Sequence, residues 1–202
     1  MTFLHWEKYQ WRLIQKGKGK TESAKAIYEK LSDSEKKSID KDTLKLYNDA
    51  LDAYKEGRVF RSGDAYYKVL PSGNVSYNKP VDKASIVNIT VPNSVLKGGF
   101  RFSVVKISVG AFKNCKKLEW VIIGKNVANI GKYAFKNTPK LQSIKIQSKK
   151  YKQGTVENAF SGAGKNSGKN LIVKVPKGYV QSYNKLFKGE GKLNKNASVI
   201  KA

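Results

Sequence analysis

One phrase of this sequence occurs twice, and its spacing limits the folds that the chain can adopt. Residues 111–123 read AFKNCKKLEWVII and residues 134–146 read AFKNTPKLQSIKI, a displacement of 23 residues. A period of roughly 20 to 29 residues with short apolar runs is typical of solenoids, in which each copy forms one coil. The matched pairs at this period are Ile107 and Ile130, Ala111 and Ala134, Phe112 and Phe135, Asn114 and Asn137, Leu118 and Leu141, Val121 and Ile144, and Ile123 and Ile146.

The repeat extends beyond these two copies in a looser form. A later copy carries Ala159 and Phe160 followed by Val173 and Val175, and an earlier one has apolar residues at positions 89, 91, 105 and 107. In each copy the alternating apolar residues predict a short strand with one inward face, and the Ala-Phe pair is expected on the opposite wall. Because one coil alone cannot bury this set, successive coils must stack around a shared core and pair their strands.

The segments ISVGAFKNCKKLEWVII and IGKYAFKNTPKLQSIKI follow the pattern I-x-x-x-A-F-x-N-C-x-x-L-x-x-V-x-I. This pattern resembles the BspA-like leucine-rich repeats of bacterial surface proteins. The flanking segments NITVPNSVLKGGFRFSVVKI and ENAFSGAGKNSGKNLIVKVPKGYVQSYNKLF resemble the first turn and the usual ending of that family. The resemblance covers residues 64–200. The sequence departs from the family at Thr138, where a cysteine is usual, and in the stretched, glycine-rich segment 155–167.

Periodicity and resemblance together predict an α+β fold, a short leucine-rich-repeat solenoid with a curved β-sheet. The repeats occupy residues 81–176 of a leucine-rich-repeat domain at 61–202. Residues 61–80 alternate apolar positions around Pro-Ser-Gly-Asn and predict a β-hairpin that caps the N-terminal end and covers the edge of the first strand. Within residues 177–202, a helix near Val180–Phe187 is expected to cap the other end.

The first sixty residues form a predicted helical module. Apolar residues recur at three- and four-residue steps in segments 3–15, 21–30 and 42–56. Ser32 followed by Glu35 is a capping box, Asp42 is the expected cap of the third helix, and Gly57 is expected to end that helix. The stretch 26–54 also resembles the small helical modules that are common in bacterial surface proteins.

Positive charge is concentrated after residue 60. Residues 1–60 hold 13 Lys and Arg against 10 Asp and Glu, whereas residues 61–202 hold 27 against 5, a net charge of +22. Rows of lysine on a solenoid either keep it soluble or attract a polyanion. Only Arg61 and Arg101 are arginines in this part, which argues against sequence-specific nucleic-acid binding. The lysines expected in rows along the turn-side wall are Lys113, Lys116, Lys117, Lys125, Lys132, Lys136 and Lys140.

Residues suited to catalysis are scarce. The one histidine, His5, lies among aromatic residues of a predicted helix, and the resemblance implies that the one cysteine, Cys115, is a buried thiol. One His and one Cys cannot form a metal cluster, and the five acidic residues after residue 60 are widely spaced. Segment 162–169, GAGKNSGK, lacks the residue order of a phosphate-binding loop. The sequence therefore predicts a non-enzymatic protein with no catalytic residue, no cofactor and no metal.

Binding residues are expected on the outer face of the sheet, where strand residues between two inward positions point outward. The predicted binding residues are Trp120, Ile122, Lys145 and Lys174, because an exposed Trp is often a contact anchor. The alternatives are that the N-terminal helices cover this patch or that its exposure has no function. The two outward columns are Thr90, Ile122, Lys145 and Lys174, and beside them Asn88, Trp120, Ser143 and Ile172.

The resemblance implies a binding or adhesion module of an exported or cell-surface bacterial protein, with a protein or glycan partner on host or neighbouring cells. The alternatives are an intracellular or secreted binder of polyanions, such as nucleic acid or acidic wall polymer, and a passive appendage of an enzyme. No apolar run is long enough to span a membrane, and the N-terminus does not have the pattern of a signal peptide. A surface location therefore implies a longer exported chain, and a cytoplasmic one is the alternative.

Overall fold

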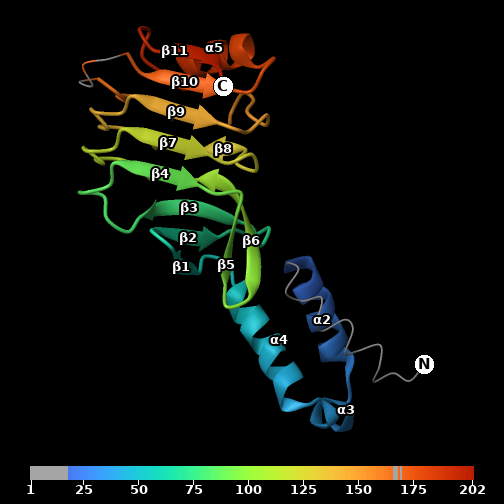
Figure 1. Cartoon of the computed structure of the whole chain (residues 1–202). Helices are drawn as coiled ribbons and strands as arrows, with labels where there is room; N and C mark the ends of the chain where they lie inside the picture. The colour runs from blue at the N-terminus through green and yellow to red at the C-terminus, as the bar shows by residue number, and fades with distance from the viewer. Residues whose placement is uncertain (1–17, 166–167, 169) are drawn as a thin grey trace.

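The computed structural model describes residues 18–165, 168 and 170–202, and shows a helical hairpin attached to one end of a stack of β-coils (Figure 1). The predicted helix at 3–15 lies outside the described residues. Helix α2 (Lys18–Lys30), the short α3 (Asp33–Ser38) and α4 (Lys41–Ala53) form the hairpin. The coils that follow lead to α5 (Val180–Gly189) near the C-terminus.

Capping interactions set the starts of the two later helices. The predicted capping box of α3 forms, because the Ser32 hydroxyl accepts from the Glu35 N–H while the Glu35 carboxylate accepts from the Ser32 N–H at 2.8 Å. The predicted cap of α4 is wrong by two residues. Asp40, not Asp42, is the N-cap, and its carboxylate accepts from the Thr43 N–H at 2.8 Å.

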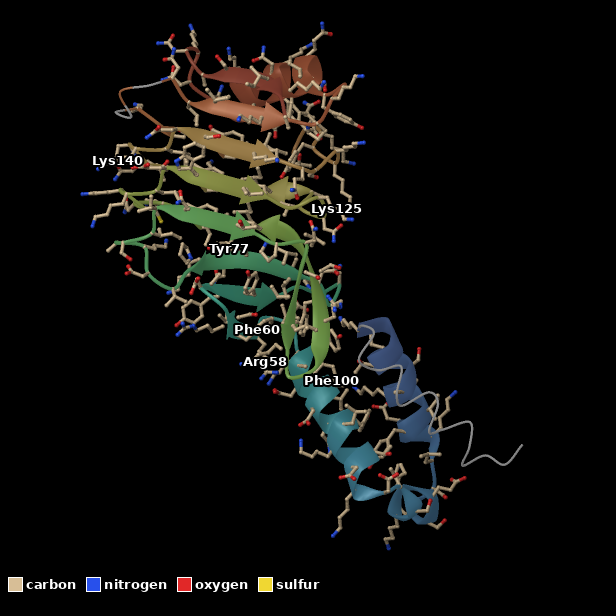
Figure 2. All side chains as sticks on the ribbon, in the orientation of Figure 1. Arg58, Phe60, Tyr77, Phe100, Lys125 and Lys140 are labelled. Carbon is tan, nitrogen blue, oxygen red and sulfur yellow. The ribbon has the colours of Figure 1, made fainter. Side chains whose placement is uncertain are left out.

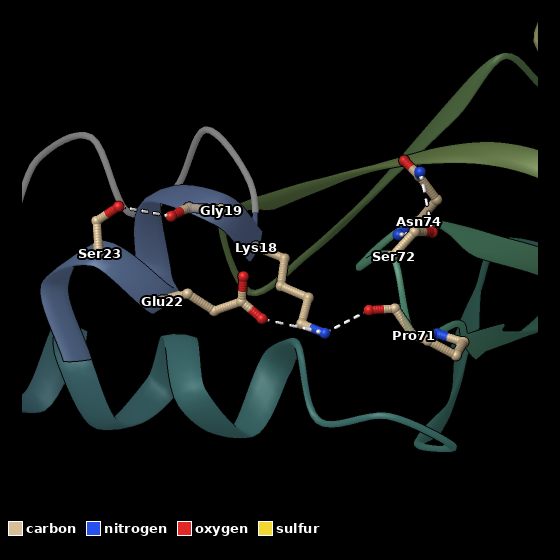
Figure 3. A network of polar contacts seen from close by, with 7 residues as sticks. All are labelled: Lys18, Gly19, Glu22, Ser23, Pro71, Ser72 and Asn74. Atoms are coloured by element: carbon tan, nitrogen blue, oxygen red, sulfur yellow. Dashed lines mark hydrogen bonds and ion pairs between the residues drawn. The ribbon is translucent and has the colours of Figure 1, made fainter. Parts of the chain in front are cut away.

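The helical hairpin contacts the β-coils at both of its ends. Tyr54, the C-cap of α4, ends that helix before Gly57 and packs its ring against Phe102 with a centroid distance of 4.8 Å. At the start of α2, the Lys18 ammonium donates to the carbonyl oxygen of Pro71 in the turn between two strands (Figure 3). The hairpin therefore contacts the first coil through both of its long helices.

The predicted β-hairpin forms, and an additional strand precedes it. Strands β2 (Ala65–Val69) and β3 (Val75–Pro80) are antiparallel, and β1 (Val59–Ser62), which spans the predicted domain boundary after residue 60, pairs with β2. Strand β3 pairs in parallel with β6 (Phe100–Ile107). This β-hairpin therefore extends the sheet that contains β6, a second sheet that was not predicted from the sequence. It does not pair with the first strand of the main sheet, as had been expected.

The main sheet has five parallel strands in the described part of the chain, in the order β11-β10-β9-β7-β4 (Figure 1). Val121 lies opposite Ile144, and Ile144 opposite Val173, so the register follows the sequence repeat. The last strand was not predicted, since residues 177–202 were expected to supply only a helix. The strands are β4 (Asn88–Val91), β7 (Trp120–Ile123), β9 (Ser143–Ile146), β10 (Ile172–Val175) and β11 (Ser198–Lys201).

A second wall runs alongside the main sheet. Strand β6 pairs in parallel with β8 (Asn129–Ile130), one coil further on. Strand β5 (Ser94–Lys97) folds back on β6 in an antiparallel pair around Gly98 and Gly99. Both glycines have positive φ, 57° and 81°, which explains why this tight reversal requires them. The segment that contains this β5–β6 hairpin was predicted to be the first turn of the repeat, and a β-hairpin was not expected there.

A column of buried aromatic rings runs through the coils. Phe112 and Phe135 stack with centroids 5.1 Å apart, and Phe135 and Phe160 stack 5.6 Å apart with ring planes only 3° from parallel. Tyr77 continues the column below at 5.0 Å from Phe112, and Phe187 of α5 continues it above at 5.1 Å from Phe160. The prediction that the Ala-Phe pairs lie one coil apart in one stack is confirmed.

Backbone hydrogen bonds join each Ala-Phe turn to the next. The Phe112 N–H donates to the Ala134 carbonyl at 2.9 Å, and the Asn114 N–H donates to the Lys136 carbonyl at 3.1 Å. Asn114 and Asn137 have φ of 66° and 58°, a left-handed conformation that Asn adopts more readily than most residues. Asparagine therefore suits the backbone conformation at this repeated position of the turn.

The predicted C-terminal capping helix is confirmed as α5. Its Tyr183 packs on Tyr151 and Phe187, with centroid distances of 5.6 and 5.1 Å. The Tyr183 hydroxyl donates to the Ser148 carbonyl and accepts from the Tyr151 N–H, both at 3.2 Å. The helix thus closes the apolar end of the stack with aromatic side chains, and the buried Tyr183 hydroxyl is hydrogen-bonded.

Candidate binding surface

In-register pairing brings the predicted outward residues of the main sheet into two columns. The first column contains Thr90, Ile122, Lys145 and Lys174, and the second contains Asn88, Trp120, Ser143 and Ile172. Strand β11 lengthens them with Ile200 and Ser198, respectively. Ile200 was not predicted, because SVIK places two apolar residues side by side and lacks the alternation typical of a half-buried strand; in the structure Val199 is buried and Ile200 is exposed.

An apolar patch lies at one end of these columns. Trp120 is 52% exposed and Ile122 is 37% exposed, and both side chains leave the same face of β7. The described helices α2 to α4 lie beyond β1 and β5, at the end of the stack, and do not cover this face (Figure 1). Cover of the patch by the described helices is therefore wrong, whereas cover by the predicted helix at 3–15 stays untested because that segment lies outside the described residues.

The patch borders an open hollow. This hollow has a volume of about 350 Å³ and is lined by Asn88, Ile89, Thr90, Trp120 and Ile122. Asn88 lies opposite Trp120, and Thr90 lies opposite Ile122. The hollow therefore has an apolar side from β7 and a side from β4 that carries amide and hydroxyl groups, which can donate and accept hydrogen bonds.

Two lysines continue the first column past the apolar patch. Lys145 is exposed and Lys174 is half-buried, and they lie opposite each other on neighbouring strands. Neither forms an ion pair with a described residue. Like charges placed directly opposite each other destabilise a sheet slightly, so an anionic group bound between them would relieve this repulsion.

The lysines that recur with the repeat divide between different edges of the coils. Lys117 and Lys140 each precede a strand of the main sheet by three residues, whereas Lys125 follows β7 by two residues. Figure 2 shows Lys140 and Lys125 on opposite sides of the stack. Lys113 and Lys136 lie in the Ala-Phe turns, which hydrogen bonds place one above the other. The structure therefore groups four of the seven lysines on successive turns and separates Lys125 from them.

Ion pairs are distributed unevenly among the described residues. Lys132 and Glu157, 3.7 Å apart, form the only ion pair among the described residues of the solenoid, and Lys132 also approaches the ring of Tyr133. The other four lie in or beside the helical hairpin and join Lys18 to Glu22, Lys25 to Glu29, Lys45 to Asp49, and Arg58 to Asp52. Most of the positive charge of the solenoid therefore has no acidic partner in the described structure.

The one cysteine of the chain is a buried free thiol. Cys115 is 0% exposed, and burial raises its pKa to about 11, so it is protonated at neutral pH. The described residues contain no group of three or more His, Cys, Asp or Glu side chains that could hold a metal ion. Among these residues no helix has the length and apolar character needed to cross a membrane.

A comparison with protein families identifies the repeat. The sequence matches the BspA type leucine rich repeat region, in six copies, over residues 82–195. A search of curated proteins finds no significant match. A solved leucine rich cell surface protein from Faecalibacterium prausnitzii is 22% identical over 61% of this chain and 28% of its own length, with a TM-score of 0.41. A leucine-rich repeat protein from Bacteroides capillosus is 13% identical over 71% of this chain and 96% of its own, with a TM-score of 0.44.

The family match covers more than half of the chain and includes strands β4 to β10 of the stacked coils. The structural elements of the repeat are visible in those residues: the in-register parallel strands, the Ala-Phe turns and the column of stacked rings. The chain belongs to the BspA-type leucine-rich repeat family.

Proposed function

We propose that this chain is a non-enzymatic binding or adhesion module that holds a protein or glycan partner against the outer face of its main sheet. Membership of a leucine-rich repeat family supports a binding role. Stacked coils also suit this role mechanically, because they present an extended surface whose residues are fixed in register from one coil to the next.

The observation that carries the proposal is the exposed Trp120 beside Ile122 at the rim of the hollow. Tryptophan combines a large apolar area with an N–H donor and is enriched among residues that dominate binding energy. Asn88 and Thr90, on the facing strand, supply hydrogen-bonding groups within the same hollow. Such a surface can accept either an apolar side chain of a protein or the face of a sugar ring.

The location that fits this role is the bacterial cell surface, as part of a longer exported chain, as the family resemblance implies. This part of the proposal has its own test. Antibodies raised against residues 61–202 should label intact, unpermeabilised cells of the source organism. Labelling only after permeabilisation would contradict the surface location and favour the cytoplasmic alternative.

Binding is tested by comparing the wild-type chain with Trp120→Ala on arrays of glycans and of extracellular matrix proteins. Loss of a tryptophan anchor is expected to weaken the interaction about tenfold or more. The matched control is Leu96→Ala, because Leu96 is 53% exposed on β5, away from the sheet face. This control should bind as the wild type does.

A thermal denaturation experiment separates binding from folding. Trp120 is half exposed, so Trp120→Ala should leave the melting temperature close to that of the wild type. The proposal fails if Trp120→Ala and the wild type bind every probe equally, or if Leu96→Ala causes the same loss as Trp120→Ala.

A further inference from the structure

A second surface of the solenoid repeats the same three exposed residues on successive coils. The first turn carries Lys113, Asn114 and Lys117, and the next carries Lys136, Asn137 and Lys140, all of them exposed. These six residues are called the lysine ladder below. The ladder lies on the turns that precede the strands, so it is distinct from the sheet face that carries Trp120.

The ladder is held in register by hydrogen bonds between the turns. The Asn137 side-chain amide donates to the Asn114 amide oxygen at 2.7 Å, and the Asn114 N–H donates to the Lys136 carbonyl. Strands and turns of a parallel stack repeat about every 4.8 Å. The backbone therefore holds the two pairs of lysines about 4.8 Å apart along the solenoid axis. Only the lysine side chains can change conformation to fit a ligand.

Negative charge beside the ladder is sparse in the described structure, where Asp82 interacts electrostatically with Lys117 without forming an ion pair. None of its four lysines forms an ion pair there. Glu157, on a neighbouring coil, forms its ion pair with Lys132, which does not belong to the ladder. Lysines stacked at this step repel one another, so the ladder should favour a ligand that brings negative charges at regular intervals along the solenoid axis.

The residue types of the ladder narrow the class of that ligand. Its cations are lysines and not arginines, which favours dispersed point charges over the bidentate contacts typical of phosphate recognition. None of its six residues is aromatic, and the neighbouring Tyr133 ring is half-buried and lies 4.9 Å from the Lys136 ammonium, so this surface suits poorly the base stacking on which binding of single-stranded nucleic acids depends. Asn114 and Asn137 each present an amide that can hydrogen-bond to hydroxyl groups.

We propose that the lysine ladder binds a linear acidic polysaccharide aligned along the solenoid axis, with its carboxylate or sulfate groups on the lysines and its hydroxyls on the asparagine amides. Sugar units of such a chain recur at intervals comparable to the coil step. The proposal does not depend on the function proposed for the sheet face, because the two surfaces share no residue.

The experiment titrates the protein by calorimetry with a sulfated glycosaminoglycan, a carboxylate-only polyuronate, a neutral dextran and duplex DNA, at low and at moderate salt. At least one acidic polysaccharide should bind at low salt and weaken as salt is added, and dextran should not bind. The tighter of the two acidic probes identifies sulfate or carboxylate as the preferred acid.

Paired variants locate the site. Lys117→Gln with Lys140→Gln removes two ladder charges and should weaken polysaccharide binding about tenfold. The control, Lys125→Gln with Lys177→Gln, makes the same change in net charge at the opposite edge, two residues after β7 and β10. It should weaken binding less than about twofold, through the overall charge alone. All four side chains are exposed, so both double variants should fold.

Three outcomes would overturn the proposal. Equal losses in the two double variants would show that diffuse charge, not the ladder, attracts the polymer. If neither acidic polysaccharide bound at low salt, acidic polysaccharides would be excluded as ligands of the ladder. Tighter, ladder-dependent binding of DNA would assign the surface to nucleic acid. Trp120→Ala should leave polysaccharide binding unchanged, so failure of the sheet-face proposal and failure of this one can be distinguished.

Discussion

Residues 18–58 hold four of the five ion pairs among the described residues, whereas the solenoid, with a net charge of +22 over residues 61–202, holds one. Packing shows the reverse distribution. Tyr28 and Tyr47 supply the ring contact between α2 and α4, at 4.8 Å, while a continuous column of rings connects Tyr77 to Phe187 through three coils.

The difference shows where each part obtains its stability. The hairpin depends on interactions between residues close in sequence, such as the Asp40 cap and pairs four residues apart. The solenoid depends on contacts between residues about 23 positions apart, which exist only when neighbouring coils are both folded. We therefore expect a change in one coil to spread through the stack, and a change in the hairpin to remain local.

The largest expected effect is that of Phe135→Ala. Phe135 is fully buried between two stacked rings, so its removal should lower the free energy of unfolding of the solenoid by about 3 to 5 kcal/mol. Denaturation in urea, followed by the near-ultraviolet signal of the solenoid, measures the change. Tyr47→Ala is the comparison in the hairpin, and an equal loss of solenoid stability in both variants would contradict the separation.

Replacing a glycine by alanine should change the stability in opposite directions in the solenoid and in the helical hairpin. A Cβ on Gly131 would lie 2.5 Å from the Val109 nitrogen and 2.9 Å from the Ile107 carbonyl oxygen, both backbone atoms of the preceding coil. Gly131→Ala should therefore destabilise the solenoid by about 1 to 3 kcal/mol. A Cβ on Gly19, in α2, meets nothing within 4 Å, so Gly19→Ala should stabilise the hairpin by up to about 1 kcal/mol. Thermal melts of the two variants check the signs, and a tolerated Gly131→Ala would mean that the coils can move apart.

Alkaline pH should destabilise the solenoid before the hairpin. Burial raises the pKa of Cys115 from 9.0 to about 11, so between these values the unfolded chain loses a proton that the folded chain retains. Stability is therefore complete below about pH 9 and declines as the pH rises toward about 11. Urea midpoints measured across this window should fall for the wild type and fall less for Cys115→Ala. Parallel curves for the two proteins would assign the alkaline loss to other groups, including Tyr67, whose pKa burial raises to about 12.

The smallest expected effect is that of Asp40→Ala. Loss of the N-cap hydrogen bond to the Thr43 N–H should destabilise α4 by about 1 kcal/mol. Hydrogen exchange should become faster for the first-turn amides of α4 and stay unchanged for the amides of β7 and β9. Asp42→Ala, which removes an acidic residue of the same turn but not the cap, is the control, and faster exchange in that variant alone would restore Asp42 as the cap.

The stacked coils were predictable because a period of 23 residues fixes both the side-chain face and the register. Val121 and Ile144 must point inward together, so Ile122 and Lys145 must share the outer column, as the structure shows. The buried Thr138, at a position where the family has a cysteine, is accommodated because its hydroxyl donates to the Phe135 carbonyl at 2.8 Å. The column residues followed from the sequence, but their role in binding stays a prediction.

Other features depended on interactions that a single segment does not contain. Strand β11 has four residues outside the repeated phrase and becomes a strand by pairing with β10. Asp40 and Asp42 are equivalent as caps until the backbone places the Thr43 N–H beside one of them. The separation of Lys125 from Lys140 requires knowing on which side of a strand each turn lies. The hollow beside Trp120 requires the relative position of β4 and β7.

The hydrogen bonds between successive Ala-Phe turns have a consequence for how such proteins change over evolutionary time. Backbone N–H groups of one turn donate to carbonyl oxygens of the next turn, as Gly110 does to Lys132 and Phe112 does to Ala134. A duplicated coil could therefore be inserted between two existing ones without any new complementary contact. The solenoid can therefore lengthen by whole coils when the gene gains repeats, while the N-terminal and C-terminal capping elements stay the same.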